Sequence, residues 1–163
     1  ILTIYEGTTA IQANDLVGRK TARDGGKNAK DIAAQIAKTE SDLIASGTAA
    51  AQAMALRLKN AREAFLEVVD FVAGKAKASP NAVYAGSVPY LMLTGNLVAG
   101  WQMGRAMLVA QEKLAQGEDV AFMQAKVVTA QFYAEHILTR TSSLRDSIVA
   151  GGESACALPL EAF

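Results

Sequence analysis

The sequence predicts an all-α fold, an antiparallel bundle of about four long helices that follows a loop and a short helix. Alanine is abundant and only three prolines occur in 163 residues, a composition that favours closely packed helices. Apolar residues recur at steps of three and four along most of the chain, which is the period of an amphipathic helix. Breaks that contain glycine divide these stretches into segments of helix length.

The chain begins with a motif that suits a loop better than a helix interior. Glu6 stands between an aromatic residue and Gly7, which lets the backbone bend. Thr9 and Gln12 have the spacing of a capping box, so we expect a helix to begin at about Ala10. The backbone N–H groups at such a helix N-terminus are donors that suit an anion such as a phosphate.

The first helix is expected to cover residues 10–23. Ile11, Leu16 and Val17 are expected to face a core, and the charged residues of this segment face water. The run Asp24-Gly25-Gly26 ends the helix. A phosphate-binding glycine loop is the alternative for the two glycines, but the rest of such a motif is missing, which favours a linker.

Two longer helices are expected at 28–45 and 49–77, with a break at Ser46-Gly47-Thr48. Glu40 is expected opposite the apolar stripe of the first helix, and Arg62 away from that of the second. Neighbouring Arg–Glu and Lys–Glu pairs on the helix at 49–77 are expected in solvent, at about 0.2–0.5 kcal/mol each. The expected core positions are Ile32, Ala33, Ile36, Ala37, Leu43 and Ala45, followed by Met54, Leu58, Ala61, Phe65, Val68 or Val69, and Val72.

The next helix is expected over 80–116. Ser79 and Pro80 suit the N-cap and the first helical position, and Pro89 is expected to kink the helix. The stretch 83–104 has no charged residue and is long enough for a membrane span, which needs about 20 residues. Polar residues inside it, and the lack of a flanking basic cluster or aromatic belt, favour a buried central helix instead.

Gly100 and Gly104 lie four residues apart in this central helix, with Gly95 nearby and Trp101 beside them. Small residues on one helix face let another helix approach closely. That neighbour is either a second subunit or another helix of the same chain. A bundle has to cover this helix in any case, so packing within the chain is the favoured interpretation.

The last helix is expected over about 120–149, with Asp119 as its N-cap and Gly151-Gly152 at its end. Residues 151–163 form an apolar tail that suits packing on another domain or subunit. The aromatic residues of the bundle, Tyr84 and Tyr90 among them, are expected in helix contacts. The expected buried edge is Phe122, Ala125, Val128 or Thr129, Phe132, Ile137 or His136, and Ser143 or Leu144.

Composition excludes several classes of function. The formal charge is zero, and no basic face with interleaved aromatic residues suits nucleic acid. His136 and Cys156 are the only residues of their kinds, too few for a zinc site, so no metal is expected. We interpret His136 as a structural or surface residue and Cys156 as an inert thiol. A single cysteine suits a reducing compartment, which predicts a cytoplasmic protein.

The stretch Tyr5-Glu6-Gly7-Thr8, followed by Ile11-Gln12, resembles the signature of the acyl-CoA dehydrogenase family near the end of its catalytic core. The continuation from Asn14 to Lys20 is similar to the branch with an extra helical domain. The chain begins with Ile and shows no signal peptide, so we expect a C-terminal fragment of a longer protein. The resemblance implies a catalytic-core remnant (1–24), an appended helical bundle (28–150) and a tail (151–163).

The resemblance also implies the roles of these residues. Glu6 would be the base that removes the α-proton of an acyl-CoA thioester while a hydride leaves the β-carbon for FAD. Thr8 and Gly7 would contact FAD, and Tyr5 would line the substrate cavity. The implied context is fatty-acid β-oxidation, with electron-transfer flavoprotein as the acceptor and a homo-oligomer, dimer or tetramer. Most of the FAD and CoA pockets would lie in missing domains, so the fragment alone is expected to be inactive.

The alternative function is a non-catalytic helical module for docking or oligomerisation. It applies to residues 28–150 and is compatible with a catalytic role for the first residues. A continuous coiled-coil signalling array is disfavoured because the breaks at Gly25-Gly26, Gly47 and Ser79-Pro80 are too frequent.

Overall fold

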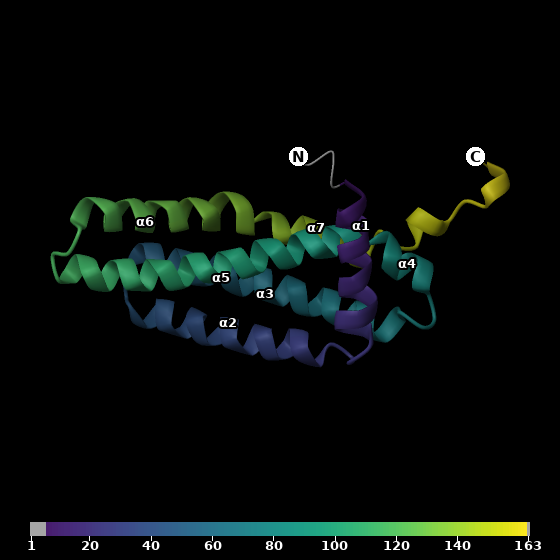
Figure 1. The fold of residues 1–163 in the computed structure, drawn as a ribbon, viewed down its shortest axis with the longest axis horizontal. Helices are drawn as coiled ribbons and strands as arrows, with labels where there is room; N and C mark the ends of the chain where they lie inside the picture. Colours follow the sequence, from purple (N-terminus) through teal and green to yellow (C-terminus); the bar gives the residue numbers. More distant parts are fainter. Residues whose placement is uncertain (1–5, 163) are drawn as a thin grey trace.

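The computed structural model describes residues 6–162, apart from the side chains of Glu6 and Leu160, and no strand occurs within this range. Four long helical segments lie side by side along the long axis of the molecule (Figure 1). The predicted all-α bundle is confirmed. Its four segments are α2 (Lys27–Ala45), α3 (Ala49–Lys75), α5 (Ser87–Ala115), and α6 (Val120–Tyr133) continued by η2 (Ala134–Leu138) and α7 (Arg140–Val149).

Shorter elements cover one end of the bundle. The helix α1 (Glu6–Asp15) and its π-helical continuation η1 (Leu16–Ala22) cross one end and contact α5 (Figure 1). The short α4 (Pro80–Ala85) lies at the same end, beside the tail with its 3-10 turns η3 (Ser154–Cys156) and η4 (Leu160–Ala162). Long helices therefore supply the core, and short elements close one end of it.

The expected loop and helix start near Ala10 are wrong for the described residues, because α1 begins at Glu6. Gly7 takes part in the helix and has no left-handed φ. Thr9 lies inside the helix, so it is not an N-cap. The N–H groups of a first helical turn have no intrahelical acceptor in any helix, so the turn at Glu6 loses no hydrogen bond that a start at Ala10 would keep. A threonine in a helix is less favourable than alanine by only about 0.5 kcal/mol. The segment therefore extends the helix at little cost in free energy.

The break between η1 and α2 is where the sequence predicts it. Gly25 and Gly26 both have left-handed φ values, 66° and 81°. The Asp24 carboxylate accepts hydrogen bonds from the N–H groups of Gly26 and Asn28, at 2.9 and 3.0 Å. The bond from Asn28 is the main cause that lowers the pKa of Asp24. Asp24 therefore satisfies one N–H group in the first turn of α2, that of Asn28, and the N–H of Gly26 just before the helix, a role that the sequence did not reveal.

The helix predicted over 80–116 is interrupted at Gly86, not kinked at Pro89. Pro89 lies in the first turn of α5, where a missing N–H costs nothing. Pro80 occupies the first turn of α4 as predicted, but Ser79 makes no side-chain cap bond. By contrast, Thr48 does cap its helix, α3, since its hydroxyl accepts a hydrogen bond from the Ala51 N–H.

The central helix α5 contacts each of the other three long segments. A Cβ atom added to Gly100 would lie 2.5 Å from the Leu138 side chain, and one added to Gly104 would lie 3.2 Å from Leu43. Both glycines therefore face other helices of the same chain, which confirms packing within the chain. Trp101 adds a polar contact, because its indole N–H donates to the Thr39 hydroxyl on α2 at 2.8 Å.

The core positions predicted on α3 are all buried. On α2, Ala33, Ile36 and Leu43 are buried, but Ile32 and Ala45 are exposed, so the predicted stripe is too wide. The helices α2 and α3 contact each other directly. The face of α2 that packs on α3 is therefore narrower than the apolar stripe that the sequence predicts.

Glu40 lies in the contact between α2 and α3, so its predicted exposure is wrong. It accepts two hydrogen bonds from the Arg62 guanidinium, at 2.7 and 2.9 Å. Only 8% of the Glu40 side chain and 16% of the Arg62 side chain are exposed. The hydrogen bond to Glu40 also raises the pKa of Arg62. A carboxylate in the core is tolerated here because a paired, bidentate partner replaces its hydration.

The predicted buried edge of the last helix is largely wrong. Phe122 and Phe132 are more than half exposed, and Ala125 also faces solvent. The residues that do pack on α3 and α5 are Ala130, Ala134, Leu138, Thr141 and Ile148. Both faces of α6 carry apolar residues, and the smaller ones are buried because they permit the closer helix contact.

The π segment η2 interrupts this last helix. Its carbonyls accept side-chain donors, since the Thr139 hydroxyl bonds to Glu135 O and the Arg140 Nε to His136 O, at 3.2 and 3.0 Å. These bonds satisfy acceptors in a turn whose i→i+5 bonding differs from that of the α-helix. The axis of the helix continues through η2 with little change in direction (Figure 1).

The contact between Gly100 and Leu138 gives a direct test of how closely α5 approaches the last long helix. We expect Gly100→Ala to destabilise the chain by about 1–3 kcal/mol, because its methyl group would overlap Leu138. The control is Gly95→Ala, where nothing lies within 4 Å of the added atom, and which should stabilise by up to about 1 kcal/mol. Urea unfolding measures both, and equal effects would contradict the contact.

The Glu40–Arg62 pair predicts a second difference in stability. We expect Glu40→Gln to cost about 2–3 kcal/mol, because it leaves the largely buried guanidinium without a counter-charge. The matched change Glu63→Gln alters a surface pair with Lys59 whose charged atoms are 3.8 Å apart, and should cost less than about 0.5 kcal/mol. Thermal unfolding of both variants at one pH and salt concentration tests this.

Candidate functional site

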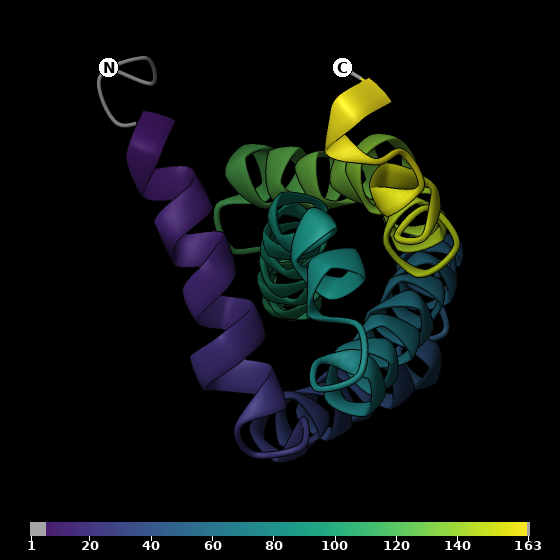
Figure 2. The ribbon, with the colours of Figure 1, turned by 90° about the vertical axis from the view of Figure 1, so that its right-hand side faces the viewer.

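The residues that the sequence marks for catalysis lie at the start of α1. Glu6 is the first residue of this helix, and Gly7 and Thr8 follow in its first turn, both exposed. Tyr5 lies outside the described residues. Figure 2 shows that the first turns of α1 (purple) stand apart from the other helices. The structure therefore places the three described residues together, on a projecting helix end.

The middle and end of this helical segment hold it to the bundle. Ala13 and Val17 are fully buried, whereas Ile11 is 64% exposed, which corrects its predicted core position. In η1 the Thr21 hydroxyl is hydrogen-bonded to the Tyr90 hydroxyl of α5, with 2.9 Å between the oxygens. A buried apolar contact and a buried polar contact thus fix the direction in which α1 leaves the bundle.

The Thr21–Tyr90 pair is a positioning feature that the sequence analysis missed. Both residues are buried, at 1% exposure each. Burial raises the pKa of the Tyr90 phenol above its ordinary value of 10.0, although the bond with Thr21 acts in the opposite direction. The only signal in the sequence is that Thr21 stands four residues after Val17, on the same helix face.

The exposed start of α1 has the chemistry of an anion-binding end. The N–H groups of a first helical turn point along the axis, and the helix dipole favours negative charge there. Gly7 has no side chain to obstruct a ligand, and nothing lies within 4 Å of a Cβ atom at this position. The residues present therefore fit a phosphate group, while the described part of the chain supplies no cavity wall around them.

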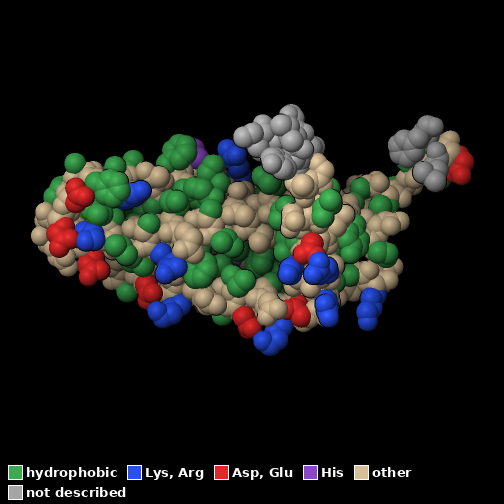
Figure 3. Space-filling model, in the orientation of Figure 1, with side chains coloured by type: hydrophobic (Ala, Val, Ile, Leu, Met, Phe, Trp, Pro, Cys, Tyr) green, Lys and Arg blue, Asp and Glu red, His purple; other side chains and the backbone are tan. Residues whose placement is uncertain are grey.

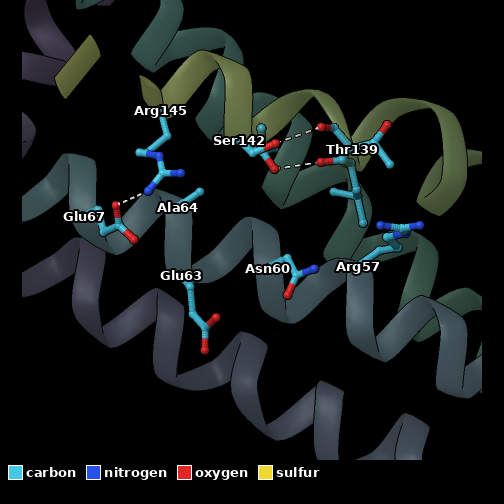
Figure 4. A pocket seen from close by; sticks show the side chains of 10 residues that line it. Arg57, Asn60, Glu63, Ala64, Glu67, Thr139, Ser142 and Arg145 are labelled. Carbon is cyan, nitrogen blue, oxygen red and sulfur yellow. Dashed lines mark hydrogen bonds and ion pairs between the residues drawn. The ribbon is translucent and has the colours of Figure 1, made fainter. Parts of the chain in front are cut away.

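A second candidate is a polar groove of about 300 Å³ between α3 and α7 (Figure 4). Arg57, Glu63, Glu67 and Arg145 line it, so positive and negative charges balance. Arg145 forms ion pairs with Glu67 and with Asp146, and the bond with Glu67 raises the pKa of Arg145.

The hydroxyl groups in this groove are also engaged. Those of Thr139 and Ser142 donate to backbone carbonyls of their own helix. Glu67, Arg145 and the two hydroxyls are thus engaged inside the protein, Glu63 pairs with Lys59, and the groove is a contact between two helices. It offers no separate group for catalysis.

The other two residues considered from the sequence, His136 and Cys156, are not part of a site in the structure. His136 lies on the surface as predicted, with its ring 4.4 Å from that of Phe132. Cys156 is a free, exposed thiol. Within residues 6–162, no group of three acidic, histidine or cysteine side chains gathers to hold a metal ion. Across the same residues, none of the helices is both long enough and apolar enough to span a membrane.

Comparisons with known proteins agree on one family. Residues 29–159 match the family model described as "Acetyl-CoA dehydrogenase C-terminal like". The 3-methylmercaptopropionyl-CoA dehydrogenase of Ruegeria pomeroyi is 52% identical over 154 residues, which cover 94% of this chain and 26% of that protein.

More distant relatives carry related names. The broad-specificity linear acyl-CoA dehydrogenase FadE5 of Mycobacterium tuberculosis is 34% identical over 90% of this chain and 25% of its own length. A butyryl-CoA dehydrogenase of Syntrophomonas wolfei is 30% identical over 100% of this chain and 27% of its own length. The chain thus spans about a quarter of the length of the curated relatives it matches.

The anchor of α1 predicts a pH-dependent effect on stability. Tyr90→Phe should cost about 1–2 kcal/mol at neutral pH, because the buried Thr21 hydroxyl loses its partner. The raised pKa of Tyr90 means that wild-type stability falls once pH exceeds 10.0, where the unfolded chain ionises first. The difference between wild type and Tyr90→Phe should therefore hold below this pH and shrink above it.

The measurement is urea unfolding of both proteins from neutral pH to above the ordinary tyrosine pKa. Tyr84→Phe is the control for the loss of a tyrosine hydroxyl, because Tyr84 is 40% exposed. A constant difference between wild type and Tyr90→Phe at all pH values would show that the phenol is not held neutral by burial.

Proposed function

Because the chain belongs to the acyl-CoA dehydrogenase family, we propose that it is the C-terminal part of an FAD-dependent enzyme that introduces an α,β double bond into an acyl-CoA thioester. The observation that carries this proposal is the place of Glu6. It is the first residue of a helix that projects beyond the bundle and is anchored to it by Val17 and Thr21. In this proposal residues 1–24 complete a catalytic core, residues 28–150 form the appended bundle, and residues 151–163 form the tail.

Glu6 is the general base in this mechanism. Its carboxylate takes the α-proton of the thioester, a transfer that requires the carboxylate to lie within hydrogen-bond distance of that carbon. An anchored helix suits this task, since a base on a rigid element keeps its position through the reaction. The proton stays on Glu6 while the electron pair of the broken C–H bond forms the new double bond.

FAD supplies the acceptor for the hydride that leaves the β-carbon. Gly7 and Thr8 would hold it through a phosphate group, because they form the exposed first turn of α1, where N–H donors and the helix dipole favour an anion. Tyr5 would line the acyl cavity. The other walls of the cavity are supplied from outside the described residues, so this chain on its own is expected to be inactive.

The substrate is proposed as an acyl-CoA with a short acyl group. The relative with 52% identity is named for 3-methylmercaptopropionyl-CoA, so a thioether-containing acyl-CoA is the first compound to test, followed by butyryl-CoA. We further propose electron-transfer flavoprotein as the acceptor of electrons, a homo-oligomeric enzyme, and, because Cys156 is the single thiol, a reducing compartment such as the cytoplasm.

A second function applies to the bundle itself. The outward face of α6 exposes Phe122 and Phe132, and an exposed apolar surface of this kind is typical of an interaction site. Residues 28–150 would then serve docking or oligomerisation, while residues 1–24 serve catalysis. The two roles belong to different parts of the chain and do not compete.

Replacement of the base tests the catalytic proposal in the longer protein that contains this chain. Glu6→Gln should leave FAD and acyl-CoA binding intact but slow flavin reduction by about 10²–10⁴-fold or more, because the α-proton has no acceptor. Stopped-flow absorbance of the flavin measures this rate. The control Asp15→Asn removes a carboxylate of the same helix that pairs with Arg19 at 2.9 Å, and should change the rate little.

The 163-residue chain alone provides a complementary test. It should melt cooperatively but bind no FAD and show no turnover. Flavin reduction at the wild-type rate by Glu6→Gln would refute the assignment of the base, whatever the behaviour of the isolated chain.

A further inference from the structure

The helical segment that carries Glu6 has a close contact with the short helix α4. Gly18 lies in η1, and a Cβ atom added to it would lie 2.7 Å from the Tyr84 hydroxyl oxygen and 3.9 Å from the ring carbon Cζ. A carbon and an oxygen atom that are not bonded overlap at the shorter of these distances. The hydroxyl end of Tyr84 therefore lies directly against the backbone of η1, at a place where a side chain would not fit.

This space, and not the backbone angles, accounts for glycine at position 18. Gly18 has no left-handed φ, so other residues could adopt its backbone conformation. Its carbonyl accepts the i→i+5 bond from the Arg23 N–H at 3.2 Å, which places it within the regular π-helical turn. Glycine is less favourable than alanine inside a helix. The close approach of Tyr84 is the feature that favours glycine in spite of this cost.

The helix α4 is itself held in place by close contacts. Val83 is fully buried. A Cβ atom added to Gly86 would lie 2.9 Å from the Ile148 side chain, and one added to Gly152 would lie 2.9 Å from the Ala82 carbonyl oxygen. Figure 2 shows α4 (teal, in front) between α1 (purple) and the tail (yellow). Tyr84 is thus presented to η1 from an element whose own position is fixed by the end of α7 and the turn after it.

The other sides of η1 are also defined. Val17 is buried in the core, and the Thr21 hydroxyl is hydrogen-bonded to Tyr90 of α5. The neighbouring Arg19 and Lys20 are exposed, and Figure 3 shows acidic and basic side chains gathered where η1 crosses the bundle. The segment therefore meets α5 on one side, α4 on a second side, and solvent on the rest of its surface.

We propose that Gly18 and Tyr84 are positioning residues for Glu6, and that their contact sets the rotation and tilt of α1. Gly18 lies twelve residues after Glu6, which is about 18 Å along a helix axis. The buried contacts of Val17 and Thr21 lie close to Gly18, so a small displacement there is enlarged at the far end of α1. A shift of about 1 Å between a base and its proton can slow a reaction about a hundredfold.

The contact is narrow enough to be exchanged between the two residues. The short distance involves the Tyr84 hydroxyl oxygen alone, and the ring carbon behind it lies at 3.9 Å, which is ordinary van der Waals contact. A methyl group at position 18 can therefore take the place of the hydroxyl group at position 84. Gly18→Ala alone creates an overlap, Tyr84→Phe alone leaves a gap, and the two changes together restore contact.

Flavin reduction by acyl-CoA in the longer protein that contains this chain tests the positioning role. Gly18→Ala should slow reduction by about tenfold or more, with FAD and acyl-CoA binding unchanged, because Glu6 is displaced and no binding group is lost. Tyr84→Phe alone should slow it by about threefold or less, and the variant with both changes should return to within about threefold of the wild-type rate. The control is Gly95→Ala, where nothing lies within 4 Å of the added atom.

Urea unfolding of the 163-residue chain tests the contact separately from catalysis. Gly18→Ala should lower the urea midpoint in the wild-type background, because of the overlap. The same change should raise the midpoint in the Tyr84→Phe background, because alanine favours a helix once the hydroxyl group is removed. Gly95→Ala should raise the midpoint in both backgrounds. Circular dichroism checks that each variant is folded.

The inference rests on the proposed role of Glu6, but the two fail in different experiments. Flavin reduction at the wild-type rate by Glu6→Gln would refute the base and the positioning role together. If Glu6→Gln is slow and Gly18→Ala is as fast as wild type, Tyr84 simply swings into solvent, and the positioning role alone is overturned. A slow Gly18→Ala variant that Tyr84→Phe does not restore would also overturn it, because the overlap would then not be with the Tyr84 hydroxyl.

Discussion

The bundle depends on how closely α5 approaches its neighbours. Gly100 leaves room for Leu138 and Gly104 for Leu43, so the backbone of α5 lies nearer to those helices than a side chain at either position would permit. Leu97 and Met107 on the same helix are fully buried as a result. Tyr90, near the start of α5, extends this contact to η1. The direction of α1, and with it the place of Glu6, therefore follows from the packing of the central helix.

The sequence predicts buried positions well where a helix has one apolar face. On α3 the three- and four-residue spacing identifies Met54, Leu58, Phe65 and Val72 correctly, because charged residues occupy the other side. The same reasoning fails on α6, whose two faces are both apolar. Periodicity alone does not show which of two apolar faces lies inside, and the larger side chains proved to be outside.

The sequence is less informative where an outcome depends on a partner far along the chain. Glu40 is buried because Arg62, 22 residues away, provides two hydrogen bonds. Ser79 and Asp119 have the right identity and position for N-caps, yet neither makes a side-chain cap bond. Asx and hydroxyl side chains cap a helix only when the backbone before it has suitable geometry, and a residue pattern does not specify that geometry.

For the candidate site, the resemblance of a few residues identified the family, and the structure corrected the local conformation from loop to helix. The roles of Glu6, Gly7 and Thr8 stay predictions, because they follow from the resemblance and not from a contact among residues 6–162. The positioning pair Thr21 and Tyr90 could not have been predicted, since 69 residues separate its members. A short motif can thus identify a catalytic segment from sequence, whereas the residues that anchor the segment are found only in the structure.

The π-helical turn η2 has a consequence for how homologous chains differ in length. Such a turn holds one residue more than an α-helical turn over nearly the same rise. A single-residue deletion at 134–138 can therefore convert it to regular helix while Thr141 and Ile148 keep their orientation toward the interior. One-residue gaps in an alignment of relatives belong at this place, where the rest of the chain can accommodate them.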